Sequence, residues 1–438
     1  MNKGKVYIDT LGCPKNQNDS EFAAGVLEEN RYVITDDPED ADFVIVNTCG
    51  FIEDAKRESI DRIFTMAQIK KPGAKLIVSG CLAQRYSEEL FEEMPEAFCF
   101  IGVNEYARIG EILDGLKERS VFAGPCVSDH LEKTVRKLSD NPYTSTLKIA
   151  EGCDRHCTYC VIPKIRGKYR SKRMEDVISE AEALAAAGCV ELVLIAEDTS
   201  CYGRDLYGRT MLPELLRKLC RVEGIRWIRL MYCYDEGITE ELADVMAGEE
   251  KICHYIDIPL QHSSDKVLRE MARRSDRRSI EERVAMLRAK MPDIAIRTTF
   301  IVGFPGETDE DFAELSDLVE NLEFERLGVF KYSLEEGTPA GEREDQVPDE
   351  TKEFRENSIM MRQMEISRAH NEALIGKTLD VIVDAYQEDG TYSGRTRYDA
   401  PEIDNGVIFT SEEPLRPGDI VPVLIEDAFD YDLTGRTV

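Results

Sequence analysis

The residues of this 438-residue chain that are best suited to chemistry are six cysteines in two groups of three. One group is compact, because the decapeptide EGCDRHCTYC places Cys153, Cys157 and Cys160 in a C-x3-C-x2-C spacing. Structural zinc takes four tetrahedral ligands, and His156 adjoins Cys157 too directly to complete such a set well. An iron–sulfur cubane normally takes one cysteine for each of its four irons. Three cysteines would therefore leave one iron open to an outside ligand, and that open position predicts a functional cluster.

The second group is dispersed in sequence, since Cys13, Cys49 and Cys81 each follow a separate strand-like run. The carboxyl ends of parallel strands lie along one edge of a sheet, where ligands bind, so these three thiols are expected to converge. Each has a glycine neighbour that allows close approach of the backbone to a ligand; these neighbours are Gly12, Gly50 and Gly80. The alternative is packing in the core, but core cysteines belong within strands, as Cys99 does. A second cluster site is the favoured interpretation.

Three units are predicted to position these groups. Over residues 1–125, short apolar runs alternate with helical patterns, which predicts an N-terminal α/β domain with a parallel sheet. A polar linker is expected at 126–142. Residues 139–370 contain six further strand–helix units and a closing helix, which fits a partial (β/α)6 TIM-type barrel better than a full eight-unit one. Residues 372–438 form short runs between Gly, Pro and Asp turns, which predicts a small all-β barrel.

Composition narrows the class of protein. No apolar stretch approaches the ~20 residues that span a bilayer, and the N-terminus lacks the apolar segment of a signal peptide. We therefore expect a cytoplasmic protein with no membrane partner. Its 13 cysteines are then better read as packing, metal-binding or catalytic residues than as disulfides.

The charge of the chain bears on its macromolecular partner. The formal net charge is −31, and residues 376–438 carry 5 basic and 14 acidic side chains, or −9. Nucleic-acid binding depends on Lys and Arg contacts to phosphate. Such a surface disfavours RNA binding and suits a basic protein partner.

The compact cysteine motif carries a resemblance to a known superfamily. C-x3-C-x2-C, with Tyr159 just before the last cysteine and after the first strand of a barrel, resembles the radical S-adenosylmethionine superfamily. The resemblance implies that S-adenosylmethionine binds the open iron through its amino and carboxylate groups. It also implies an electron donor protein, and a 5′-deoxyadenosyl radical formed on one-electron reduction.

Other segments are candidates for the cofactor site. The segment FIVGFPGETDEDF (300–312) reads as a strand, a tight turn and a helix capped by Thr308. The residues alone leave open a phosphate-binding loop, which the acidic first turn would oppose, or simply a capped barrel helix. The resemblance implies a wall near the adenine, formed by Ile301, Gly303 and Phe304. It also likens Glu197 to the contact for the cofactor's amino group, where close relatives usually have glutamine. Gln261 ends the fourth barrel strand and would either reach the ribose or be a polar residue of the barrel rim.

The combination of two cysteine triplets narrows the resemblance to the methylthiotransferase family, which replaces an unactivated C–H bond with C–S–CH3. It implies two 4Fe-4S clusters held by the six cysteines, and a terminal barrel that resembles the TRAM module. The segment LGCPKNQNDSE resembles the branch that modifies an aspartate β-carbon in a small-subunit ribosomal protein. The tRNA-modifying branch usually has Gln-Met where this chain has Pro14-Lys15.

Two other functions remain as alternatives: a methylthiotransferase acting on tRNA adenosine, and a non-catalytic iron–sulfur or zinc redox-sensing protein.

The basic run KIRGKYRSKR (164–173) is interpreted either as a solvated loop or as part of the binding site. In the second case Lys164, Arg166 or Lys168 would meet an acidic target side chain or the cofactor carboxylate. The remaining cysteines are predicted to be packing residues; they are Cys99, Cys126, Cys189, Cys201, Cys220, Cys233 and Cys253.

Overall fold

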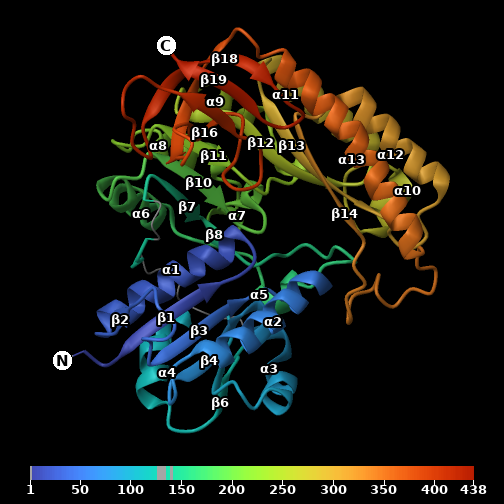
Figure 1. Ribbon diagram of the computed structural model, residues 1–438. Helices are drawn as coiled ribbons and strands as arrows, with labels where there is room; N and C mark the ends of the chain where they lie inside the picture. The colour runs from blue at the N-terminus through green and yellow to red at the C-terminus, as the bar shows by residue number, and fades with distance from the viewer. Residues whose placement is uncertain (1, 126–134, 139–141) are drawn as a thin grey trace.

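The computed structural model describes residues 2–125, 135–138 and 142–438. Three units follow one another in space as they do in sequence (Figure 1). The blue N-terminal unit lies at the bottom of the view, the green-to-yellow strands lie in the middle, and the red C-terminal barrel lies at the top.

The N-terminal unit is a six-stranded sheet in the order β2-β1-β3-β4-β5-β6, with every pair parallel. Its central strands are buried on both faces and rich in Val and Ile, as parallel strands covered by helices usually are. The strands are β1 Lys5–Thr10, β2 Val33–Ile34, β3 Phe43–Thr48, β4 Lys75–Gly80, β5 Cys99–Ile101 and β6 Ser120–Phe122. The helices are α1 Pro14–Glu29, α2 Glu53–Ile69, α3 Cys81–Glu93 and α4 Ile109–Gly115.

The middle unit is a second parallel sheet in the order β14-β13-β12-β11-β10-β7. Its two edge strands are not paired with each other, so the predicted partial six-stranded barrel is confirmed. The strands are β7 Thr144–Lys148, β10 Glu191–Ile195, β11 Trp227–Leu230, β12 Ile252–Gln261, β13 Ala295–Val302 and β14 Arg326–Lys331. The longer helices are α6 Met174–Ala186, α8 Leu212–Leu219, α9 Glu240–Gly248, α11 Arg277–Lys290, α12 Asp309–Leu322 and α13 Asp349–Glu372.

The last unit is the predicted all-β barrel, closed in the order β15-β16-β17-β19-β18. Its strands are β15 Thr378–Tyr386, β16 Tyr392–Thr396, β17 Val407–Thr410, β18 Ile420–Ala428 and β19 Leu433–Thr437. This barrel docks at the amino ends of the half-barrel strands through buried ion pairs. Glu191 pairs with Arg395 at 2.9 Å, and Arg326 pairs with Asp399 at 2.6 Å.

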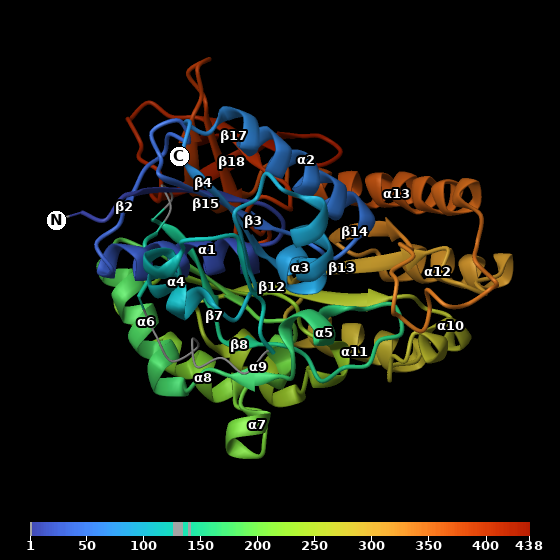
Figure 2. The same ribbon diagram turned by 90° about the horizontal axis from the view of Figure 1, so that it is seen from below.

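The N-terminal unit docks on the half-barrel from the other side, through α1 (Figures 1 and 2). The polar side chains of α1 are buried with its apolar ones, because the half-barrel covers the face that the sheet leaves free. Asn18 Nδ2 donates to Thr146 Oγ1 over 3.1 Å, and the ammonium of Lys148 contacts the carboxylate of Asp19.

The predicted linker lies mostly outside the described residues, but its described part, 135–138, packs on both units. Arg136 is buried between Glu21 of α1 and Glu180 of α6, and its distance to Glu180 Oε1 is 2.8 Å. No helix in the described part of the chain is both long and apolar enough to cross a membrane.

Candidate functional site

The dispersed cysteines lie at the carboxyl edge of the N-terminal sheet. Cys13 precedes α1, Cys49 follows β3, and Cys81 begins α3. The segments carrying the first two touch, since a Cβ built on Gly12 would lie 2.8 Å from the Cβ of Cys49. Gly12 also has a φ of +89°, a conformation that favours glycine. The glycine beside Cys13 is therefore needed both for its backbone conformation and for this close approach.

The compact triplet lies in the loop between β8 (Ala150–Glu151) and α5 (Ile162–Arg166). Backbone N–H groups point at two of its sulfurs: Arg155 N lies 3.4 Å from Cys153 Sγ, and Ile162 N lies 3.5 Å from Cys160 Sγ. Hydrogen bonds to cluster sulfurs are among the features that set reduction potential. The loop backbone thus directs an N–H group at each of these two sulfurs.

Burial raises the pKa of Cys81, Cys153 and Cys160 to about 12 each, so these thiols are protonated until a metal displaces the proton. Within residues 2–125, 135–138 and 142–438, no three His, Cys, Asp or Glu side chains are grouped closely enough to hold a single metal ion. A cubane does not require such convergence, because each cysteine ligates a different iron. His156 is exposed whereas Cys157 is buried, so the histidine does not join the triplet.

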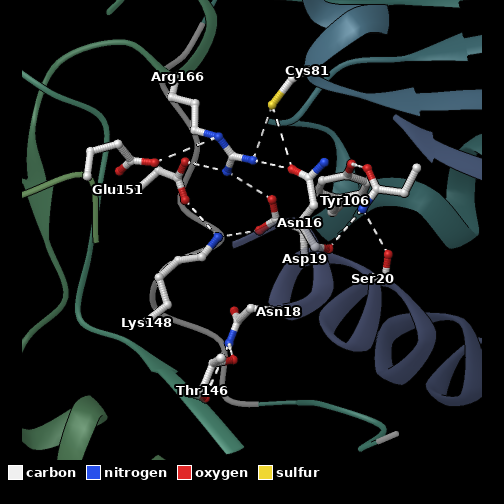
Figure 3. Close-up of polar contacts among 12 residues, drawn as sticks. Asn16, Asn18, Asp19, Ser20, Cys81, Tyr106, Thr146, Lys148, Glu151 and Arg166 are labelled. Carbon is white, nitrogen blue, oxygen red and sulfur yellow. Dashed lines mark hydrogen bonds and ion pairs between the residues drawn. The ribbon is translucent and has the colours of Figure 1, made fainter. Parts of the chain in front are cut away.

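Arg166 ends α5, the helix that follows the compact triplet, and its side chain reaches Cys81 of the dispersed triplet (Figure 3). Its guanidinium is buried and donates to Asp19 over 2.9 Å, to Glu151 over 2.7 Å and to Asn16 over 2.8 Å. Its Nη2 also lies 3.4 Å from the sulfur of Cys81. One cation from the compact-triplet loop therefore contacts both α1 and a cysteine of the other triplet.

Glu197, just beyond β10, is a buried carboxylate on the compact-triplet side of Arg166. Its side chain is 5% exposed, and neither oxygen has a hydrogen-bond partner in the structure. The nearest cation is Arg166, whose Nε is 3.8 Å from Oε1. Burial, and then the charge of Glu151, raises the pKa of Glu197 to about 7. A desolvated carboxylate without hydrogen-bond partners fits a ligand amino group, which is the chemistry expected at this position.

Lys15, from the first turn of α1, lies close enough to Glu197 for the two charges to interact. Its Nζ is 3.4 Å from the centroid of the Tyr232 ring and 3.5 Å from the carbonyl oxygen of Ala196. Burial acts to lower the pKa of Lys15, but Tyr232, Cys13 and Glu197 together outweigh it and raise the pKa. Sequence reasoning used this lysine only as a family marker.

Two of the expected adenine-wall residues share one apolar cluster with Tyr159. Tyr159, Ile301 and Phe304 pack together, with the Phe304 ring 5.6 Å from the ring of Tyr332. Gly303 lies in this turn with its backbone N–H directed at Glu307 Oε2, 2.6 Å away, and Phe304 N donates to the same oxygen. Because Glu307 occupies these donors, the turn does not form a free phosphate site.

Gln261 ends β12 with a φ of +73°, which is unusual for a residue other than glycine. Its side-chain Nε2 donates to the carbonyl of Pro259 over 3.3 Å. In the structure it is therefore a partly satisfied polar residue of the barrel rim.

The basic run is not simply a solvated loop. Arg166 and Lys172 are buried in ion pairs, whereas Lys164 and Lys168 are exposed. Most of the cysteines expected to pack do so: Cys99, Cys189, Cys220, Cys233 and Cys253 are buried. Cys201 is half-buried with its sulfur 3.1 Å from Asp198 Oδ2, and Cys126 lies outside the described residues.

Family models match all three units of the chain. Residues 5–102 match the uncharacterized protein family UPF0004, residues 147–319 the radical SAM superfamily and residues 375–438 the TRAM domain. A ribosomal protein uS12 methylthiotransferase RimO from Acetivibrio thermocellus is 49% identical, covering 100% of this chain and 99% of the relative. The corresponding protein of Lachnoclostridium phytofermentans is 47% identical, covering 98% and 99%. The chain belongs to the RimO family of methylthiotransferases.

Solved structures support the fold of this RimO-family chain. The radical S-adenosylmethionine methyltransferase TsrM from Kitasatospora setae has a TM-score of 0.56 at 16% identity, covering 78% of this chain and 77% of that one. The cobalamin-dependent S-adenosylmethionine radical enzyme OxsB has a TM-score of 0.52 at 13% identity, covering 83% and 56%. Membership of the radical SAM superfamily brings with it S-adenosylmethionine and a 4Fe-4S cluster.

The raised pKa of Glu197 leads to a testable pH dependence of stability in this RimO-family chain. Its folded pKa of about 7 exceeds the ordinary 4.5, so the folded state binds more protons between these values. Stability due to this group is therefore present at low pH and lost as pH rises through that window. Without S-adenosylmethionine, the free energy of unfolding of the parent should fall as pH rises from 4.5 to 7. In Glu197→Gln this fall should be smaller by more than ~1 kcal/mol.

Urea unfolding at several pH values measures this difference. The exposed Glu310→Gln provides a matched control that should follow the parent curve. Parallel curves for Glu197→Gln and the parent would show that the carboxyl is not protonated in the folded state.

Proposed function

We propose that this RimO-family chain inserts a methylthio group at the β-carbon of an aspartate in the small-subunit ribosomal protein uS12. The observation that carries the proposal is the pairing of two cysteine triplets, each at the carboxyl edge of its own parallel sheet. Arg166, Glu197 and Lys15 lie between them. The family relationship supplies the reaction class and the substrate.

The six cysteines would hold two 4Fe-4S clusters. Cys153, Cys157 and Cys160 would hold the cluster whose open iron takes S-adenosylmethionine, and Cys13, Cys49 and Cys81 the other. When bound, these groups supply the radical that removes hydrogen and the sulfur that replaces it. The residues present fit this assignment, because Glu197 offers a buried carboxylate without hydrogen-bond partners for the cofactor's amino group. Tyr159, Ile301 and Phe304 would offer an apolar wall for its adenine, next to Gly303, and Gln261, at the end of β12, would reach the ribose.

The chain's own residues would hold the two halves of the site in register. Arg166 fixes the compact-triplet loop against α1, and Lys148 adds a second buried cation against Asp19 and Glu151. This network buries the junction between the sheets and keeps bulk water from it. We propose domain boundaries at 1–125, 139–370 and 372–438, which place this junction between the first two domains.

The surface charge supports a basic protein partner over RNA. The TRAM match by itself favours RNA, since such modules bind RNA in tRNA enzymes. In this barrel, however, Arg395 already donates to the carboxylates of Glu191 and Asp384. Arg397 donates to the carbonyl oxygens of Glu250 and Ile252. Its exposed face carries the acidic residues Asp380, Glu388, Asp389, Glu402, Glu412, Glu413, Asp419, Glu426, Asp427 and Asp432.

The proposal is tested by offering the reconstituted enzyme both substrates, with S-adenosylmethionine, sulfide and a reductant. Mass spectrometry of uS12 should show one methylthio group in place of one hydrogen, on an aspartate. Unmodified tRNA in the same reaction is the matched control. A methylthio group on tRNA adenosine, with uS12 unchanged, would contradict the proposal and favour the tRNA-modifying alternative. An absence of S-adenosylmethionine cleavage under all conditions would favour a non-catalytic redox protein.

A further inference from the structure

Lys15 is a buried lysine that forms no ion pair with a carboxylate of the described residues, unlike three other buried lysines of this protein. Only 9% of it is exposed. Lys148, Lys172 and Lys352 are equally buried, and each forms an ion pair with a carboxylate. Within the described part of the chain, the Lys15 ammonium forms no ion pair, and its single hydrogen bond, to Ala196 O, is 3.5 Å long. An ammonium has three donors, and leaving them unused in a buried place costs free energy.

Neighbouring strand ends and the backbone of Tyr232 fix the position of the Lys15 ammonium. It lies at the carboxyl ends of β10 and β11, where Ala196 and Tyr232 follow the strands. Tyr232 has a φ of +58°, a strained conformation for an aromatic residue. Its backbone N–H is held by Asp257 Oδ2 at 3.0 Å, and its ring lies against the ammonium. The strained backbone thus places an aromatic face beside a cation.

The other candidate cations for an acidic substrate are exposed or already hold other partners. Lys164 is exposed and donates to the carbonyl of Gly337, and Lys168 is exposed. Arg166 has four partners of its own. Glu197, the nearby carboxylate, has no contact with Lys15 short enough to be an ion pair.

We infer that Lys15 is a substrate-binding residue, whose ammonium pairs with the side-chain carboxylate of the target aspartate between the two cysteine triplets. This inference rests on the proposed function and names the residue that selects an acidic target. In a desolvated site the ammonium supplies unused donors to a carboxylate, and the pair places the neighbouring β-carbon. An asparagine in the same position would leave the charge of Lys15 uncompensated, so the site distinguishes the two side chains.

A double-mutant binding cycle tests this inference. Recombinant uS12 with Asp or Asn at the target position is titrated into the reconstituted full-length enzyme by calorimetry, without S-adenosylmethionine. The parent should bind the Asp form at least about tenfold more tightly, and Lys15→Met should abolish that preference, as buried charge pairs at interfaces do. Lys15→Arg keeps the charge and should retain part of the preference. Lys168→Met removes the same charge from an exposed site and should retain all of it.

Each outcome of these titrations either supports or contradicts the role of Lys15. An equal preference for the Asp form in Lys15→Met and the parent overturns the role of Lys15 while leaving the proposed function intact. A parent that binds neither form overturns both. If Lys15→Met fails to fold, as judged by its iron content, Lys15→Arg decides, because loss of the preference there with native iron content contradicts a charge-pairing role. An affinity for S-adenosylmethionine that falls about tenfold in Lys15→Met, with the Asp preference unchanged, would assign Lys15 to the cofactor instead.

Discussion

Replacing Cys153, Cys157 and Cys160 together by alanine is expected to abolish reductive cleavage of S-adenosylmethionine to below detection. The reason is that the cofactor carries the chemistry and these thiols would hold the iron that binds it. Replacing Cys13, Cys49 and Cys81 together should give a different result: cleavage to 5′-deoxyadenosine persists, but no methylthio product forms. Chromatography of both products from the same reactions measures the difference.

The matched control is Cys220→Ala, which removes a buried cysteine of the half-barrel core. It should keep both activities. Loss of cleavage in both triple variants would indicate that the two triplets are not independent sites. Methylthiolation without Cys13, Cys49 and Cys81 would remove any role for the dispersed triplet.

Arg166→Met is expected to have the largest effect on stability, lowering the free energy of unfolding by about 3–5 kcal/mol. The variant leaves the buried carboxylates of Asp19 and Glu151 with Lys148 as their remaining cation in this network. Such uncompensated charge is costly because neither carboxylate can reach water. Urea unfolding is followed by the fluorescence of Trp227, the single tryptophan, which is buried in β11.

Arg173→Met is the control for Arg166→Met, since Arg173 is exposed and pairs with Asp176 on the surface of α6. Its loss should cost no more than ~1 kcal/mol. An Arg166→Met protein as stable as this control would mean that the network does not hold the two sheets together.

The sequence predicts the parts of this molecule that depend on local pattern. Strand-like runs followed by cysteines locate Cys13, Cys49 and Cys81 at one sheet edge, because parallel strands must end on the same side. For the turn after Phe304 the sequence leaves a phosphate loop and a capped helix open, and the structure shows Glu307 occupying the backbone donors.

What the sequence does not predict depends on how the units dock. Polar residues of a surface helix usually face water, but Asn18 and Asp19 of α1 are buried against the half-barrel. Likewise, a run of six basic residues reads naturally as a solvated loop, and nothing local marks Arg166 as the one that enters the junction. Lys15 was visible only as a difference between branches of a family, because its environment is made by strands more than 180 residues away in sequence.

Iron and sulfide content after anaerobic reconstitution tests most directly whether the two triplets are separate cluster sites. We expect roughly eight irons per chain in the parent and roughly four in each triple cysteine variant, one cubane being lost in each case. Roughly four irons in the parent, falling to none without Cys153, Cys157 and Cys160 and unchanged without Cys13, Cys49 and Cys81, would contradict this expectation. Bound zinc in place of iron would contradict it as well.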